Sequence, residues 1–209
     1  MNLADSTDAA DARVALRTRL RGQRAQLSAS QRVAAANGLV ASLEQLPEFH
    51  VDQRIAGYWA VGGELPLHTA VARLRARGQQ YHLPIVAANH TLRFAPLRID
   101  SVLRPNRYGI PEPECDPAEL IAPEQIELVL LPLVAFDRRG HRLGMGAGYY
   151  DRSFAFLHAA ARPASPLLVG IGYSLQEVEA VPAQGHDVPL DFIATEKELI
   201  DCTNPQAPS

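Results

Sequence analysis

The chain has 209 residues, 47% of them apolar and 21% charged, and its formal net charge at pH 7 is −3. This balance is ordinary for a globular protein and gives no overall reason to expect nucleic-acid or membrane binding. The two cysteines, Cys115 and Cys202, lack metal-ligand spacing, and a single pair says little about an oxidising compartment. The acidic start has no signal-peptide core and no apolar run reaches the length of a bilayer span, so we expect a cytoplasmic protein.

A first helix is predicted from about residue 5 to 26, because apolar side chains recur there at four-residue spacing. A second face of this helix carries four arginines with no acidic residue between them: Arg13, Arg17, Arg21 and Arg24. A solvated basic face is the ordinary interpretation, but surface helices usually mix charge signs, so a charged ligand is the alternative. Ser28 and Gln31 form a predicted capping box that opens a second helix to about Leu46.

From Arg54 the hydrophobic pattern changes to strands alternating with helices. We predict strands at 54–61, 81–86, 92–97, 128–133, 167–173 and 188–195, and a helix from Pro66 to Arg77. A proline-dense stretch from 98 to 125 favours an irregular connection. These elements predict one α/β domain over residues 1–209, with a mainly parallel sheet between two helical layers. We expect an N-terminal helical pair (about 5–46) to pack on the sheet region (about 54–200).

The segment LVLLPLVAFDRRGHRLGMGAGYYDR, residues 128–152, organises the rest of the chain. A buried strand leads into a turn at Gly140, three glycines at alternate positions (Gly144, Gly146, Gly148) and a helical pattern. Such a layout presents backbone N–H groups to an anion, although a flexible loop without a ligand would also explain the glycines. Four flanking cations would add positive charge: Arg138, Arg139, Arg142 and Arg152. The spacing fits neither the P-loop nor the dinucleotide fingerprint.

Carboxylates follow two of these features. Glu64 comes just past a predicted strand end, where ligand sites of α/β sheets lie. Asp151 follows the glycine loop and Asp191 lies in the last predicted strand, and two carboxylates near phosphates suit Mg²⁺. A helix-start residue is the alternative for Asp151. The chain has no G-x-S-x-G elbow and no zinc-ligand cluster, and His186-Asp187 reads as a turn.

The run FDRRGHRLGMGAGYYDR closely resembles the signature of the 5-formyltetrahydrofolate cyclo-ligase (5,10-methenyltetrahydrofolate synthetase) family. RVALRTRLRGQR, GGEL, YGIPEP and GHDVPLDFIAT extend the resemblance from Arg13 to about Ile200. It implies ATP- and Mg²⁺-dependent conversion of 5-formyltetrahydrofolate to 5,10-methenyltetrahydrofolate, with release of ADP and phosphate. In the implied mechanism ATP phosphorylates the formyl oxygen and N10 closes the ring. The implied partners are ATP and the folate, with or without a polyglutamate tail, and neither nucleic acid nor a membrane.

The resemblance also implies residue roles. The implied ATP-binding residues are Arg13, Arg17, Arg142, Leu143, Gly144, Met145, Gly146, Ala147, Gly148, Tyr149 and Tyr150. Arg17, Trp59 and Glu64 would contact the folate, while Arg17, Tyr149 and Tyr150 would be catalytic. Asp151 and Asp191 would hold magnesium. Because phosphate charge needs more cations than the loop offers, we expect the Arg13–Arg17 face to dock against the glycine loop.

Two positions depart from the family pattern. The family's usual lysine is Arg13 here, and Ala147 stands where glycine or lysine is more usual. These departures leave open a folate- or nucleotide-binding protein of the same scaffold with little or no turnover. Nucleic-acid binding through the arginine face is a third hypothesis, which predicts a steep salt dependence.

Overall fold

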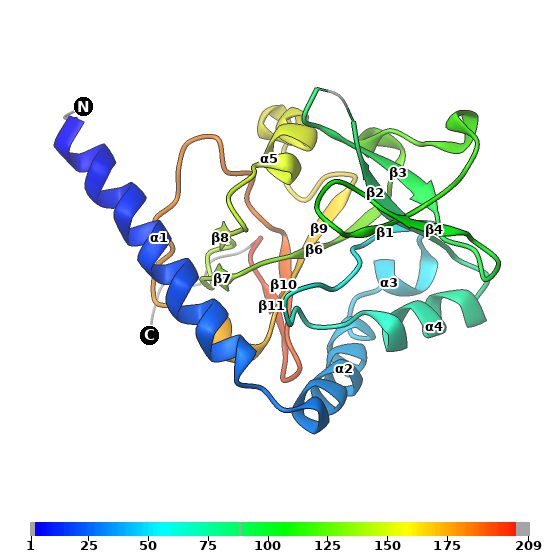
Figure 1. Ribbon diagram of the computed structural model, residues 1–209, viewed down its shortest axis with the longest axis horizontal. Helices are drawn as coiled ribbons and strands as arrows, with labels where there is room; N and C mark the ends of the chain where they lie inside the picture. Colours follow the sequence, from blue (N-terminus) through cyan, green and yellow to red (C-terminus); the bar gives the residue numbers. More distant parts are fainter. Residues whose placement is uncertain (1–2, 88, 204–209) are drawn as a thin grey trace.

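A seven-stranded sheet forms the centre of the computed structural model, which describes residues 3–87 and 89–203 (Figure 1). Its order is β11-β10-β9-β6-β1-β2-β3. The strand bounds along this order are Leu199–Asp201, Phe192–Ala194, Leu167–Ile171, Leu128–Pro132, Arg54–Ala56, Gln80–Val86 and Leu92–Pro96. The five inner strands run parallel, and the edge strands β3 and β11 are antiparallel to their neighbours. The predicted mainly parallel sheet is confirmed.

Helices cover both faces of this sheet, as the burial of β6 on both faces requires. Leu128 and Leu130 pack into one core cluster with α2 (Ala29–Leu43) and α4 (His68–Ala76). Val129 and Leu131 point the other way, into a second cluster that contains Phe154, next to α5 (Tyr149–Ser153). Successive residues of a strand face opposite sides, so a central strand buried on both faces defines three layers. Figure 1 shows α2, α3 (Glu48–Val51) and α4 on one side and α5 on the other.

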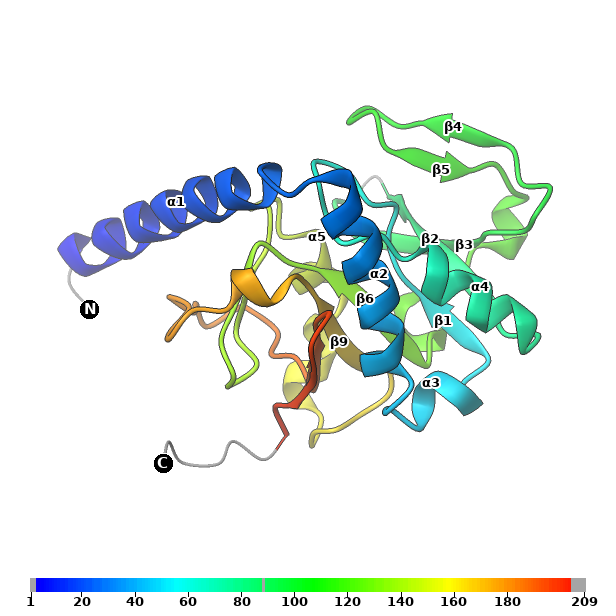
Figure 2. The same ribbon diagram turned by 90° about the horizontal axis from the view of Figure 1, so that it is seen from below.

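Both helices of the predicted N-terminal pair are present, but they lie against different parts of the molecule. α1 (Leu3–Ala25) lies along one side of the molecule, and α2 turns away from it under the sheet (Figures 1 and 2). The predicted capping box of α2 is confirmed, because Ser28 Oγ accepts from Gln31 N and Gln31 Oε1 accepts from Ser28 N. Among the described residues, no helix combines the length and apolar character needed to cross a bilayer.

Short elements differ from the sequence-based boundaries. The first strand stops at Ala56 instead of continuing to residue 61, because the chain leaves the sheet there to line a pocket. The proline-dense stretch contains a small hairpin, β4 (Leu103–Pro105) and β5 (Pro111–Pro113), that stands apart from the main sheet in Figure 2. A second hairpin, β7 (Ala135–Phe136) with β8 (Arg142–Leu143), forms across the turn at Gly140, whose φ is +84°.

The strand order contains one reversal that positions the site. β2 lies on one side of β1, and the next parallel strand in the chain, β6, lies on the other side of β1. Chain segments leaving β1 and β6 therefore diverge at their carboxyl ends. In open α/β sheets, ligands bind in the crevice at such a switch point.

Candidate active site

A cavity of about 500 Å³ opens at the switch point, which is the usual size of a small-molecule site. The segments that line it include α1, the chain after β1, the carboxyl ends of β2 and β6, the glycine loop with α5, the β4–β5 hairpin and the loop before β10. The sequence-predicted residues on its wall are Arg13, Arg17, Trp59, Glu64, Arg142, Gly144, Met145, Gly146, Ala147, Gly148, Tyr149, Tyr150 and Asp151. Two predicted site residues, Leu143 and Asp191, are not on this wall.

Helix α1 brings two arginines to the cavity. Arg17 Nε donates to the carbonyl oxygen of Gly144 at 2.9 Å, and its guanidinium lies against Gly146. Arg13 Nη1 donates to Asp187 Oδ2 at 2.8 Å and to the carbonyl of Pro182. Burial, with the neighbouring Arg13, lowers the pKa of Arg17. The expected docking of this helix face against the glycine loop is confirmed, across 127 residues of sequence.

The glycine loop is held from behind by Arg152. Its Nη2 donates to the carbonyl of Ala147 at 2.6 Å, and its Nε donates to that of His90 at 3.0 Å. Gly148 has a φ of +67°, and a Cβ there would lie 2.8 Å from Arg152 Nη1. The positive φ is what favours glycine at this position, because the Arg152 side chain could move away from a Cβ. α5 is only five residues long, so the backbone of the loop, more than a helix dipole, is what the cavity offers an anion.

The cations around the site are not the ones that flank the loop in sequence. Arg138 pairs with Glu177 and Glu198, and Arg139 pairs with Asp137, so both are neutralised away from the cavity. The Arg152 guanidinium donates its hydrogen bonds to two backbone carbonyls. Of the four, only Arg142 lines the cavity, and it is bound to Asp151 Oδ1 at 2.7 Å. The positive charge that we expected from these four arginines is supplied to the cavity mainly by α1.

The segment after β1 forms the opposite end of the cavity. Gly62 and Gly63 have φ values of +55° and +79°, and Glu64 Oε2 accepts from the backbone N–H of Val61 at 3.0 Å. Burial raises the pKa of the Glu64 carboxyl, opposed by the hydrogen bond from Val61 and by the charge of Arg24. Trp59 is 39% exposed and lines the wall beside it. The segment after β1 therefore contributes both a carboxylate and an indole to the cavity wall.

Two consecutive tyrosines of α5 have different surroundings. Tyr150 lines the cavity, and burial followed by the charge of Glu64 raises its pKa. The Tyr149 hydroxyl lies 2.6 Å from that of Tyr108 and accepts from Arg107 Nη2 at 2.7 Å, which ties the β4–β5 hairpin to α5. Tyr150 faces the ligand space, whereas Tyr149 also closes the cavity.

The two aspartates predicted to share a magnesium ion are not brought together. Asp151 lines the cavity and accepts from Arg142 and from the N–H of Val188. Asp191 is 1% exposed, is paired with Arg162 and accepts from the N–H of Leu168. It precedes β10, at the amino end of a parallel strand, whereas the cavity opens at the carboxyl ends. Residues 3–87 and 89–203 contain no group of three or more His, Cys, Asp or Glu placed to hold a metal.

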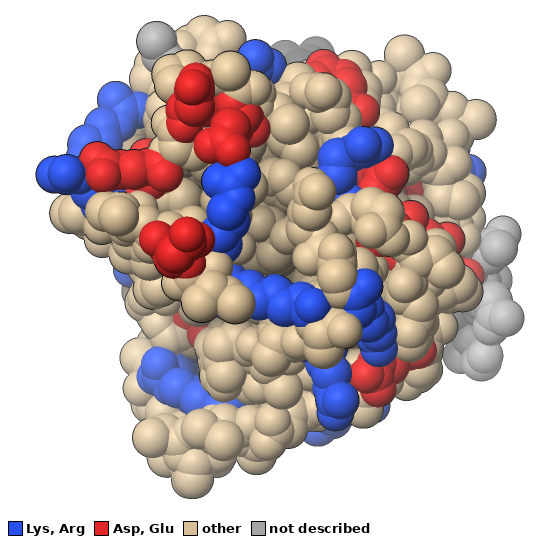
Figure 3. Space-filling model, turned by 90° about the vertical axis from the view of Figure 1, so that its right-hand side faces the viewer, with Lys and Arg blue, Asp and Glu red and all other residues tan. Residues whose placement is uncertain are grey.

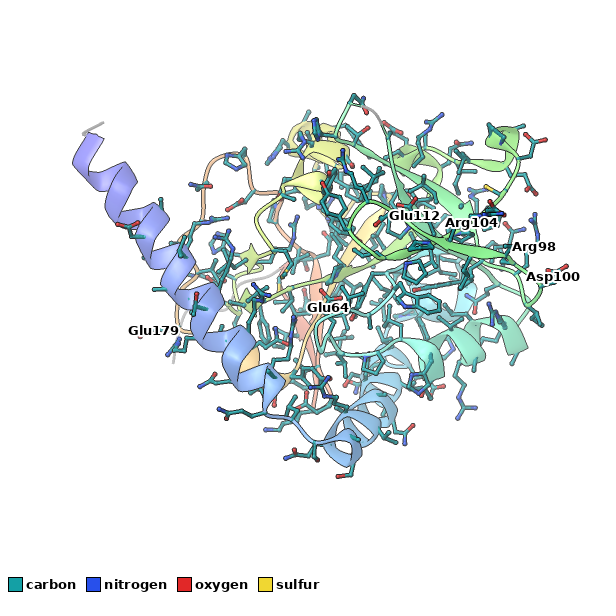
Figure 4. The ribbon with its side chains drawn as sticks, viewed as in Figure 1. Glu64, Arg98, Asp100, Arg104, Glu112 and Glu179 are labelled. Atoms are coloured by element: carbon teal, nitrogen blue, oxygen red, sulfur yellow. The ribbon has the colours of Figure 1, made fainter. Side chains whose placement is uncertain are left out.

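Two wall carboxylates were missed by the sequence interpretation. Asp187, which the sequence analysis assigned only to a turn, lies on the cavity wall and accepts from Arg13. The next residue, Val188, donates its backbone N–H to Asp151. Glu112 of β5 also lines the cavity, held by the Asn106 side chain and the N–H of Val86. Figure 4 shows Glu112 on the β4 side, away from the central Glu64. Asp187 lies in the segment GHDVPLDFIAT and Glu112 in YGIPEP. The resemblance of these two segments to the family was the signal in the sequence that could have identified both residues.

This arrangement defines a class: a three-layer α/β protein whose ligand cavity lies between a glycine loop with cations and a carboxylate–indole end. The model of the 5-formyltetrahydrofolate cyclo-ligase family matches residues 9–196. The chain is 32% identical to 5-formyltetrahydrofolate cyclo-ligase of Haemophilus influenzae over 177 residues, 84% of this chain and 92% of that one. It is 29% identical to the enzyme of Escherichia coli K12, over 86% of this chain and 98% of that one.

Solved structures agree with this match. The NMR structure of Aquifex aeolicus 5,10-methenyltetrahydrofolate synthetase superposes with a TM-score of 0.79 at 28% identity, over 94% of this chain and 96% of that one. The chain belongs to the 5-formyltetrahydrofolate cyclo-ligase family, and it is a ligase of folate one-carbon metabolism.

Proposed function

We propose that the protein converts 5-formyltetrahydrofolate to 5,10-methenyltetrahydrofolate, using ATP with Mg²⁺ and releasing ADP and phosphate. The observation that carries this proposal is the contact between Arg17 Nε and the carbonyl of Gly144, because it joins the arginine helix and the glycine loop in one cavity with Glu64. The names of the similar proteins supply the substrate.

The phosphates of ATP would lie between α1 and the glycine loop. Arg17 points its cation at this space, Arg13 lines it while paired with Asp187, and the backbone of residues 144–148 borders it. The Arg13 guanidinium, which replaces the family's usual lysine, is bound to Asp187 at 2.8 Å and to the carbonyl of Pro182. Ala147 uses its carbonyl to bind Arg152. Neither departure removes a group that the proposed site needs.

The pterin ring would lie at the Glu64 end. A pterin edge presents adjacent N–H donors, and a carboxylate can accept two of them in parallel. Trp59 offers an apolar face beside it, and Tyr150 lies between this end and the loop. The formyl group on N5 would then face the phosphates, within reach of Arg17.

The chemistry explains why arginines and loop amides suffice. The formyl oxygen of an N5 amide is a poor leaving group, and attack of this oxygen on the γ-phosphorus releases ADP and leaves an iminium phosphate. N10 attacks the iminium carbon, loses its proton, and the carbon–oxygen bond breaks to release phosphate. Phosphoryl transfer depends mainly on positioning and charge stabilisation. Arg17 would stabilise the transferred group, with Tyr149 and Tyr150 as the adjoining hydroxyls.

Asp151 fits a magnesium ligand, since Mg²⁺ is commonly held by one or two carboxylates together with substrate phosphates and water. Its Oδ1 binds Arg142 and Val188 N, and its Oδ2 has no hydrogen-bond partner among the described residues. Bound there, Mg²⁺ would neutralise phosphate charge. Asp191 is left out of the proposed site because Arg162 and Leu168 occupy its carboxylate.

Steady-state turnover tests the proposal. Formation of the methenyl product from 5-formyltetrahydrofolate is followed by its absorbance, with ATP and Mg²⁺ each omitted in turn. We expect product only in the complete mixture, with one ADP formed per product. Tight binding of either ligand without turnover would favour the alternative, a binding protein of the same scaffold.

A further inference from the structure

The last turn of α1 carries an arginine that the proposed reaction does not use. Arg24 is 1% exposed, and its Nη2 donates to the carbonyl of Gly62 at 3.0 Å. Its Nε and Nη1 are also buried and have no hydrogen-bond partner among the described residues. Leaving a buried donor unpaired costs about 1–3 kcal/mol, so native structures contain few and each needs an explanation.

A purely structural role does not account for this position. A cation in the last turn of a helix is favoured by the helix dipole, but an exposed side chain gains that benefit without desolvation. Arg21, one turn earlier on the same helix, is exposed. Burial is the main influence on the pKa of Arg24 and lowers it, while the charge of Glu64 opposes this effect.

The guanidinium is placed behind the turn that presents Glu64. Gly62 and Gly63 both have positive φ, and Glu64 closes the turn by accepting from Val61 N. Arg24 fixes the first of these glycines, and the side chain of Arg32 lies behind the second. Arg32 is itself anchored to the carbonyls of Leu27 and Arg24. The turn therefore rests on two arginines that do not line the cavity.

We infer that Arg24 is a positioning residue for folate recognition: its buried guanidinium fixes the Gly62–Gly63 turn and places a positive charge behind the Glu64 side chain. This inference rests on the proposed function, in which Glu64 accepts from the pterin. The groups that face Glu64 are Arg24 of α1, Tyr58, Tyr150 of α5 and Tyr173. Arg24 is the cation among them, whereas the tyrosines are neutral, and the Tyr173 hydroxyl donates to the backbone carbonyl of Glu64.

The test compares Arg24→Met with Arg21→Met and Glu64→Gln, measuring folate affinity against pH. Methionine removes the charge and the unpaired donors at similar length, so we expect thermal stability to hold or rise, since replacing a buried charge by an apolar side chain is often neutral or stabilising. Folate affinity should fall by about tenfold or more near neutral pH, the size expected for a charged hydrogen bond. The loss should shrink as pH rises, because the more easily protonated Glu64 is then ionised again. ATP affinity should not change.

Further comparisons separate the outcomes. In Glu64→Gln, adding Arg24→Met should weaken folate binding little more, because the carboxylate it serves is gone. If Arg24→Met fails to fold, Arg24→Lys replaces it in the test. This variant keeps the charge and should retain most of the folate affinity. Unchanged folate affinity in Arg24→Met, or a loss additive with that of Glu64→Gln, would overturn the inference. A wild-type protein that binds no folate would instead refute the proposed function.

Discussion

Asp151 and Asp191 show how much a residue's surroundings decide its role. Both are aspartates near the glycine loop or a strand end in the sequence, yet only Asp151 has an oxygen directed at open space. An isolated carboxylate next to phosphate is repelled by several kcal/mol at a moderate effective dielectric. A divalent cation between the two anions reverses the sign of that interaction.

Asp151→Asn is therefore expected to raise the Mg²⁺ concentration for half-maximal rate by about tenfold or more, with a much smaller effect on the folate requirement. Without metal, nucleotide binding should be unchanged or slightly tighter, because a repulsive charge is gone. Rates titrated with Mg²⁺ and nucleotide binding in chelator provide the two measurements.

Asp191→Asn is the matched control. It should leave the Mg²⁺ dependence unchanged and lower the melting temperature, because it weakens the pairing of Arg162 and the acceptor for Leu168 N–H. The opposite pattern, with Mg²⁺ dependence changed only by Asp191→Asn, would return the metal to the position that the sequence assigned.

Local patterns predicted Glu64 and the glycine loop well. A Gly-Gly turn after a strand places the next residue at the sheet edge whatever the neighbours are. The role of Asp191 was not predictable in the same way, because it depends on which end of β10 opens into the cavity. Asp187 was missed because its partner, Arg13, lies 174 residues earlier. Pairing across such a separation leaves no pattern within either segment.

At the scale of elements, α1 is the part whose position matters most. Three of its four aligned arginines are turned inward: Arg13 and Arg24 are buried, and Arg17 is partly buried. The face is therefore not a solvated basic surface, which removes the geometric basis for nucleic-acid binding through it. On the side of the molecule seen in Figure 3, basic and acidic residues are interspersed.

Arg17→Ala should weaken ATP binding by about tenfold or more, the size of a lost charged hydrogen bond, with little change in stability. The reason is that its guanidinium is partly exposed in the cavity and makes one hydrogen bond, to a loop carbonyl. Isothermal titration with a non-hydrolysable ATP analogue measures the affinity.

Arg19→Ala, an exposed position of the same helix, serves as the control and should match wild type. If Arg17→Ala melts at a markedly lower temperature while its ATP affinity is intact, the arginine is structural and the proposed phosphate site lacks its main cation.

Element order and type could be read from the sequence because the strands are apolar runs and the helices carry caps and stripes. The ends of elements could not. β1 stops at Ala56 because its continuation lines the cavity, and the β4–β5 hairpin is tied to α5 by the contact of Tyr108 with Tyr149. These outcomes are decided by tertiary contact.

In the whole molecule, a partly buried carboxyl at the amino ends of the strands affects stability from the edge of the sheet opposite the cavity. Asp52 comes just before β1, at the amino ends of the strands, away from the cavity. Burial, with the nearby charges of Glu127 and Glu48, raises its pKa to about 6. The folded protein therefore binds a proton there more readily than the unfolded chain does.

The sign of this linkage gives a prediction for stability. Between the unfolded value, 3.8, and about 6, the folded state holds more protons at Asp52, so this group destabilises the fold increasingly as pH rises through that window. Asp52→Asn should raise the melting temperature at pH 7 and give little gain at pH 4. Thermal melts at both pH values measure this, with turnover as the check that activity is unchanged. A gain at pH 4 as large as that at pH 7 would show that ionisation is not the cause.

The proposed reaction requires one cavity to hold the formyl oxygen against the γ-phosphate of ATP. Substrate carrying ¹⁸O in the formyl group provides the test. We expect one ¹⁸O atom in each inorganic phosphate released, because the labelled oxygen attacks phosphorus and leaves with it. Methenyl product formed alongside unlabelled phosphate would contradict the account, since phosphate would then derive from water attacking ATP.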